Sequence, residues 1–467
     1  MGKTPGNRTT AAGHVGAVAA ALACRRPLLR GGPPTSSRGL ARMDVDVQFQ
    51  ATWEPQLDGA AAYWERCAGR GGRLWEVRVE EETELQDGVA LCASRECDET
   101  DVLESLWPMH FMRLTGRRAA KRASVVELGH WRQLHLDFVL AGFEKCGTSS
   151  LSHNLARHPQ VEFVPEVDAN PEVNSDSQAA QDGNFFWFLG NRYLPPLALV
   201  QAFNEGRCCQ GGALPSAAVD PQGRPAGVAD GHVGDAASGG RRLVLRAERN
   251  PVYAFRRFIM KAISLVPAAK VVLVACDPIG WLHSAYADTT NWHDDTHAGH
   301  ALAPQPPLNA FATADLVPLP WSGSGPRPSD AWYNLSRRRA LFSYMVQALL
   351  ELFGGAATSR LFLLHRDTVD PATVGASGVR EAYDGLAAFL GIEAFPVDFA
   401  FERRNLPKPS AGRTGGGRVL CAPSEAHALN ALRHYFRWEG SRLAALLTRL
   451  GGVVPTRLLR NRTFCDT

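Results

Sequence analysis

Apolar runs alternate with helical periodicity from Leu134 onward. The runs 136–141 and 270–275 are long and apolar enough for strands buried on both faces. Helical periodicity follows the first run, where Leu151 and Leu155 share one face. Strands that alternate with helices predict an α/β fold with a P-loop-like, three-layer core around a central, mainly parallel sheet.

The α/β domain is predicted to span residues 134–450. Two low-complexity stretches interrupt it, and we interpret both as surface insertions. They lie at 205–241, which is rich in Gly, Ala and Pro, and at 297–330, which is rich in Pro. The other predicted segments are a leader at 1–43, an N-terminal extension or small domain at 44–133, and a tail at 451–467.

Composition restricts the class of protein. Of the 467 residues, 45% are hydrophobic and 21% are charged, which is typical of globular proteins and excludes wholesale disorder and coiled coil. The 50 basic and 47 acidic residues give a formal charge of +3, too balanced for the net charge to indicate a nucleic-acid partner. Any anion-binding site is therefore expected to be local.

The leader contains basic residues and no acidic one before Asp44. Its apolar run, 15–24, is well below the ~18 residues that span a bilayer. These features favour an organelle-targeting segment or a poor signal anchor, so membrane association stays open. The alternatives are a tail without fixed structure and a true start at Met43.

Ten cysteines show no paired metal-binding spacing. In an oxidising lumen, Cys92 could pair with Cys97, and Cys421 with Cys465. The segment that includes His293, Asp294, Asp295 and His297 is a weak metal-site hypothesis because its spacing is irregular.

The segment 142–151, GFEKCGTSSL, follows the first predicted strand and enters the first predicted helix. Gly142 and Gly147 permit backbone angles that turn several N–H groups toward one point. The N-terminus of the new helix adds partial positive charge, so the loop is expected to hold a phosphate. Further donors come from Lys145, Thr148, Ser149 and Ser150.

The loop is not a Walker A motif, because Lys145 precedes Gly147 instead of following it. This position disfavours a kinase or NTPase. The segment instead resembles the 5′-phosphosulfate loop of sulfotransferases that use 3′-phosphoadenosine-5′-phosphosulfate (PAPS). The resemblance implies a catalytic and cofactor-binding role for Lys145, and cofactor-binding roles for Cys146, Gly147, Thr148, Ser149 and Ser150.

A second segment, 270–286, resembles the family's 3′-phosphate site. In the family its strand ends in Arg-Asp-Pro, and a Ser follows about two helical turns later. Ser284 matches that Ser, which implies that it binds the 3′-phosphate. Cys276 stands where the Arg is expected, and a thiol cannot replace a charged, forked donor. An Arg from the nearby basic cluster is one candidate replacement.

Other segments resemble the heparan sulfate type of sulfotransferase in the same order along the chain. They are ERNPVYAF at 248–255, LFLLHRDTVDP at 361–371, and the C-terminal run 421–447. In that branch the base is a Glu after the first helix. Glu166 is the best match, with a one-residue gap, and Asp168 is the second choice. His153 is expected to be a surface or packing residue.

The resemblance predicts transfer of a sulfuryl group from PAPS to a hydroxyl or amine of a carbohydrate, without a metal. A polyanionic glycan would suit the basic cluster, although such clusters are more often solvated. The Golgi lumen or membrane is the implied location. The alternative function is a sulfotransferase-like binding or scaffold protein with impaired catalysis, since Cys276 replaces the Arg. The cluster consists of Arg241, Arg242, Arg246, Arg249, Arg256 and Arg257.

Overall fold

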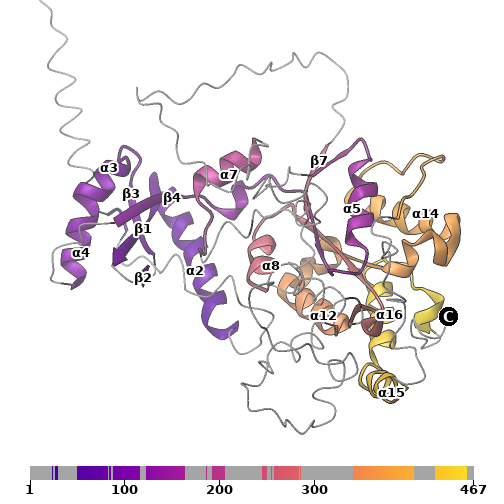
Figure 1. Cartoon of the computed structure of the whole chain (residues 1–467). Coiled ribbons are helices and arrows are strands. Elements are labelled where there is room, and N and C mark those ends of the chain that lie inside the picture. The colour runs from indigo at the N-terminus through magenta and orange to yellow at the C-terminus, as the bar shows by residue number, and fades with distance from the viewer. Residues whose placement is uncertain are drawn as a thin grey trace, which may run out of the picture. The chain divides into compact units, whose positions relative to one another are not determined.

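The chain divides into two compact units (Figure 1). The first comprises Met1–His135, Val164–Ser238 and Lys261–Pro267, and the second Leu136–Phe163, Gly239–Met260 and Ala268–Thr467. The computed structural model describes residues 24, 27–29, 50–81, 84–85, 88–115, 123–163, 186, 192–205, 244–249, 254, 257–282, 284, 340–403 and 426–459.

An antiparallel sheet forms the centre of the first unit. β1 pairs with all three other strands, through Leu74↔Cys92 to β3 and Leu74↔Leu128 to β4, for example. Successive side chains of β1 point to opposite faces of the sheet, so each face can pack against a different part of the unit. The elements of this unit are α2 (Gln50–Gly69), β1 (Gly72–Glu81), β2 (Glu84–Leu85), β3 (Val89–Ser94), α3 (Glu99–Asp101), the π-helix Val102–Leu106, α4 (Trp107–Thr115), β4 (Ala123–Leu128), the 3₁₀ helix Trp131–Gln133 and α7 (Leu197–Asn204).

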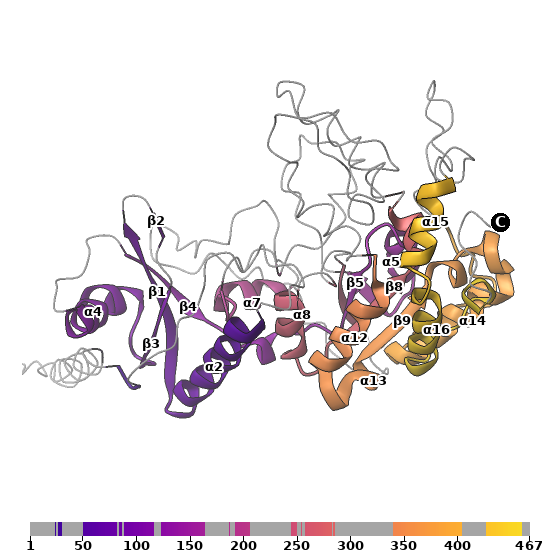
Figure 2. The same cartoon turned by 90° about the horizontal axis from the view of Figure 1, so that it is seen from below.

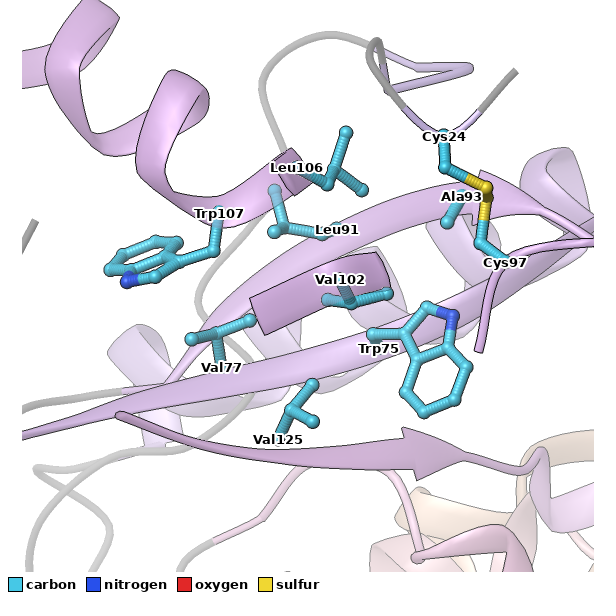
Figure 3. Close-up of a cluster of buried hydrophobic side chains, with 10 residues drawn as sticks. All are labelled: Cys24, Trp75, Val77, Leu91, Ala93, Cys97, Val102, Leu106, Trp107 and Val125. Carbon is cyan, nitrogen blue, oxygen red and sulfur yellow. A yellow bond between two sulfur atoms is a disulfide. The ribbon is translucent and has the colours of Figure 1, made fainter. Parts of the chain in front are cut away.

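Two disulfides hold this unit together, and the predicted pairing of Cys92 with Cys97 is wrong. Cys92 pairs with Cys67, and Cys97 pairs with Cys24. Cys97 lies in the hydrophobic cluster on the face of β3 that also carries Leu91 (Figure 3). Cys92 occupies the next position along β3, so its side chain points to the opposite face. The other proposed pair, Cys421 with Cys465, lies outside the described residues.

The second unit has an α/β fold built on a five-stranded parallel sheet with the order β6-β7-β5-β8-β9. The fold class predicted from the sequence is confirmed. β8 (Lys270–Ala275) coincides with the predicted strand, and β5 (Phe138–Gly142) lies within two residues of its prediction. Every residue of β5 is buried, as expected for a central strand covered on both faces, and every residue of β9 (Leu361–His365), at the end of the strand order, is buried as well.

Helices cover both faces of this sheet (Figure 1 and Figure 2). The connections β5→β6 and β8→β9 run in opposite directions across the sheet, so right-handed crossovers place their helices on opposite faces. α5 (Thr148–Ala156) is joined to α14 (Pro371–Leu390) by a hydrogen bond, and α12 (Phe342–Phe353) is joined to α16 (Glu439–Arg449) in the same way. The result is three layers, with the sheet in the middle.

The remaining elements are β6 (Val161–Phe163), β7 (Leu245–Arg249), α8 (Arg257–Ser264), the 3₁₀ helices Gly354–Ala356 and Arg366–Thr368, α13 (Ala357–Arg360), α15 (Ala426–Tyr435) and α17 (Thr456–Leu459). α8 contains residues of both units. The boundaries proposed from the sequence, at 134 and 450 among others, stay predictions.

Candidate functional site

The predicted phosphate loop joins β5 to α5. Gly147 is the N-cap of α5, with φ at 97°, a left-handed conformation that favours glycine. It supplies no side-chain cap, and the first N–H groups of any α-helix have no partner inside the helix. Lys145 also has a positive φ, 60°. The loop therefore places a lysine residue and the start of a helix after the carboxyl end of a central strand.

Three hydroxyl-bearing residues follow Gly147 in the sequence and form the start of α5. Thr148 and Ser149 are buried, and Ser150 is half-buried. The Ser149 Oγ accepts a hydrogen bond from Nη2 of Arg249 at 2.9 Å. Arg249 ends β7, beside β5, and is only 5% exposed. This arginine therefore contacts the first turn of α5 from the adjacent strand, whereas the sequence offered an arginine of the basic cluster as a replacement at the 3′-phosphate or as a contact of a polyanionic glycan.

A disulfide joins the loop to the second predicted segment. Cys146, the residue after Lys145, is bonded to Cys276, the residue after β8. Both cysteines are buried. The Cys146 N–H donates to the Phe143 carbonyl at 3.2 Å, so the sulfur and the amide of Cys146 are both engaged within the protein. Cys276, which stands where the Arg was expected, therefore forms a crosslink to the loop.

The second segment is held against the loop by one further contact. Trp281 lies in the helical turn 278–282, and its indole N–H donates to the Glu144 carbonyl at 2.8 Å. Ser284 follows and is half-buried. One helical turn separates Ser284 from Trp281, which places both on neighbouring parts of the helix surface. The structure thus brings the two motifs, more than a hundred residues apart, to one edge of the sheet.

Asp277 lies directly before the helical turn 278–282, which precedes Ser284. Its Oδ1 accepts a hydrogen bond from the Gly280 N–H at 2.7 Å. Burial raises the pKa of Asp277, while the Gly280 hydrogen bond and Arg457 act in the opposite direction. Asp277 therefore has a structural role as a cap, in addition to forming part of the charged cluster described next.

Sequence reasoning missed a cluster of charges after β9. Arg457 of α17 pairs with Asp367 at 3.3 Å and with Asp277 at 3.6 Å. Arg403 pairs with Asp370 at 3.2 Å. Arg366, the first residue after β9, packs beside the loop, since a Cβ built on Gly147 would lie 3.6 Å from its Cγ. The available signal was a basic residue directly after a buried strand.

Several predicted site residues lie outside the described residues. His153 is described, and its Nε2 lies 3.0 Å from Oε2 of Glu402, a surface pair of the kind expected for it. The residues outside the described ranges are Glu166, Asp168, Arg241, Arg242, Arg256, His293, Asp294, Asp295 and His297.

Within the described ranges, no group of three or more His, Cys, Asp or Glu side chains is arranged to hold a metal ion. None of the helices in these ranges is both long enough and apolar enough to cross a membrane.

Comparison with known proteins gave one kind of match. No family model and no curated protein matches the chain. Among solved structures, a sulfotransferase from Alicyclobacillus acidocaldarius matches with 18% sequence identity and a TM-score of 0.36. The match covers 67% of this chain and 96% of that one. The α/β fold rests on the strand order and the parallel pairing of the chain itself.

Proposed function

We propose that this protein is a sulfotransferase that transfers a sulfuryl group from PAPS to a hydroxyl or amine of a carbohydrate. One observation carries the proposal. The glycine-bounded loop with Lys145 lies between a buried parallel strand and a helix, and the segment of Ser284 is attached to that loop. These are the two motifs that the resemblance to PAPS-dependent sulfotransferases assigns to the two ends of the nucleotide.

The donor set around the loop suits a nucleotide phosphate. Lys145 supplies a positive charge, and the hydroxyls of Ser149 and Ser150 supply hydrogen bonds. Arg249 lies at the end of the adjacent strand and donates to Ser149. The N-terminus of α5 favours negative charge beside it. These groups would hold the 5′-phosphate, and Ser284 would contact the 3′-phosphate.

The chemistry requires one cation and one base. PAPS supplies the sulfuryl group, with a nucleotide phosphate as the leaving group. As the acceptor oxygen or nitrogen bonds to sulfur, the bond from sulfur to the phosphate oxygen breaks. Lys145 would stabilise the negative charge that develops on that oxygen. The acceptor proton would pass to a carboxylate, for which Glu166 is the proposed base and Asp168 the second choice.

Three disulfides support an oxidising compartment. Such bonds persist in secretory compartments and are rare in the cytosol. We therefore propose the Golgi lumen, where carbohydrate acceptors are available. A polyanionic glycan is the proposed acceptor class.

A second candidate function is a nucleotide-binding scaffold without transfer activity. The observation that favours it is Cys276, which replaces the Arg expected at the 3′-phosphate and is held in a disulfide. A scaffold of this kind would still bind the desulfated nucleotide.

The proposed function is tested by calorimetric titration of the whole chain with 3′-phosphoadenosine-5′-phosphate (PAP). The control ligand is adenosine 5′-phosphate, which lacks the 3′-phosphate. We expect PAP to bind at least tenfold more tightly, since a hydrogen bond to a charged group such as the 3′-phosphate contributes about 1.5–3 kcal/mol. A Ser284→Ala variant should lose affinity for PAP and keep its affinity for the control.

The outcomes separate the candidates. Absence of binding by either nucleotide would overturn both the enzyme and the scaffold. If PAP binds, the protein is next incubated with PAPS and a panel of glycosaminoglycans, and PAP release is measured. Release that depends on the glycan supports the enzyme, and tight PAP binding with no release from any acceptor supports the scaffold.

A further inference from the structure

Arg366 lies at the carboxyl edge of the parallel sheet, directly after β9. Its aliphatic chain packs beside Gly147, where a Cβ would lie 3.6 Å from the arginine Cγ. A larger residue at Gly147 would have an unfavourable φ, and its Cβ would lie in ordinary van der Waals contact with this side chain. The contact places an arginine next to the loop residue that begins α5.

Arg366 differs from the two neighbouring arginines, Arg403 and Arg457, in its ion pairs with carboxylates. Arg403 has Asp370, and Arg457 has both Asp367 and Asp277. Within the part of the chain that the structure describes, no carboxylate lies within ion-pair distance of the Arg366 guanidinium. The three carboxylates of this cluster are thus paired with two of its three arginines.

The surroundings of Arg366 favour an added anion. Burial, followed by the positive charge of Arg403, lowers the pKa of Arg366, although Asp370 and Asp367 act against this shift. An arginine stays protonated even with a lowered pKa, so the Arg366 guanidinium carries a positive charge that water only partly solvates. An anion at the loop would supply the missing partner.

We propose that Arg366 binds the 5′-phosphate of the nucleotide, together with Lys145. This inference rests on the proposed function, which places that phosphate at the loop. A guanidinium matches two phosphate oxygens with two parallel hydrogen bonds, whereas a lysine offers a single charged centre. Arg366, directly after β9, thereby supplies a forked cation to the 5′-phosphate, whereas the expected arginine that Cys276 replaces belongs to the 3′-phosphate.

The test compares the affinities of two nucleotides for the full chain and its variants. The nucleotides are PAP and adenosine 3′-phosphate, which lacks the 5′-phosphate. The variants are Arg366→Gln and Arg366→Lys. Arg449→Gln is the matched control, because Arg449 is an exposed arginine in the last turn of α16. Thermal melting of each variant monitors folding.

We expect Arg366→Gln to weaken PAP binding about tenfold to a hundredfold and to leave adenosine 3′-phosphate within about twofold of the unaltered protein. Arg366→Lys should fall between, because it keeps the charge and loses the fork. Arg449→Gln should change neither affinity. If Arg366→Gln does not fold, the lysine variant gives the comparison by itself.

Three results would overturn the inference. Unchanged PAP affinity in the Arg366 variants would remove Arg366 from the site and leave the proposed function intact. An equal loss of affinity for both nucleotides would mean that Arg366 acts through the overall electrostatic potential of the charged cluster and not by contact with the 5′-phosphate. Failure of the unaltered protein to bind PAP would overturn the proposed function, and the inference with it.

Discussion

At the scale of single residues, Lys145 carries the proposed chemistry. Lys145→Ala is expected to lower transfer about 10²–10³-fold, because it removes a charge aimed at the leaving oxygen. The fold should persist, since Lys145 is half-buried and Ala tolerates a φ of 60° no worse than Lys does. The measurement is PAP release from PAPS with an active glycan acceptor, alongside thermal melting.

A matched control is Lys261→Ala, which removes a lysine from an ion pair with Asp58 in the first unit. Transfer by this variant should equal that of the unaltered protein. Full activity of Lys145→Ala would remove the lysine from the mechanism and leave the loop without its proposed cation.

His365 gives a residue-scale prediction about pH. It is fully buried at the end of β9, and its Nδ1 accepts a hydrogen bond from the Asp367 N–H at 3.2 Å. Burial lowers the pKa of His365 to about 4, an effect that Asp367 opposes and that Arg457 and Arg366 reinforce. The unfolded chain, with an ordinary histidine pKa, binds the proton first as pH falls.

Stability should therefore decrease as the pH falls from about 6.5 toward 4, by roughly 3 kcal/mol if His365 is the titrating group. The measurement is urea-induced unfolding at pH 7 and at about pH 4.5. His365→Asn, which keeps a short polar side chain at this position, should lose less stability over that interval. Equal losses in the two proteins would assign the pH dependence to other groups.

At the scale of elements, α5 is fixed by one buried asparagine. The Asn154 amide donates to the Tyr383 hydroxyl at 2.8 Å and to the Glu402 carbonyl at 3.0 Å. Its oxygen accepts from the Glu402 N–H at 2.9 Å. These bonds join the helix that begins at the phosphate loop to α14 and to the segment after it. The orientation of the loop's helix thus depends on side-chain contacts far along the chain.

Asn154→Leu is expected to destabilise the protein by about 2–4 kcal/mol, because it leaves the Glu402 backbone groups and the Tyr383 hydroxyl without this partner. Urea-induced unfolding measures the loss. Tyr383→Phe should recover part of it in the double variant, since the buried hydroxyl is then absent. Strict additivity of the two substitutions would mean that the Asn154–Tyr383 bond contributes nothing.

The elements nearest the motifs were the most predictable. β8 and the start of α5 match their predictions because both are set by local patterns, an apolar run and a Gly followed by helix-compatible residues. The pairing order of the strands was not predictable at this level. β7 enters the sheet between β6 and β5, and nothing in the local pattern of 245–249 specifies that neighbour.

At the scale of the whole molecule, disulfides crosslink each unit internally. Cys146–Cys276 closes a sequence separation of 130 residues, and Cys67–Cys92 closes one of 25. Replacing Cys146 and Cys276 together by Ser should cost about 3–5 kcal/mol, because the unfolded chain gains the freedom that the crosslink removed. The loss should be concentrated in the second unit, where β5 and β8 meet.

Hydrogen exchange of peptides that cover β5 and β8 is the measurement, with the double serine variant of Cys67 and Cys92 as the matched control. The first variant should speed exchange in both strands, and the control should leave them unchanged because its disulfide lies in the other unit. Unaltered exchange in the first variant would show that the sheet needs no crosslink. PAP affinity, measured on the same sample, reports whether the loop keeps its binding geometry.

The sequence by itself determined the features that depend on neighbours in the chain: the α/β class, the strand and helix on either side of the loop, and the glycine at the start of α5. It also located the departure at Cys276, although not its meaning. Only the tertiary structure decided that Cys276 pairs with Cys146, that Arg249 contacts Ser149, and that Arg366 packs beside Gly147. The physical reason is that these contacts join residues a hundred or more positions apart, through the order in which parallel strands align. Local periodicity specifies an element and its buried face, whereas the partner across the sheet is chosen by packing of the whole domain.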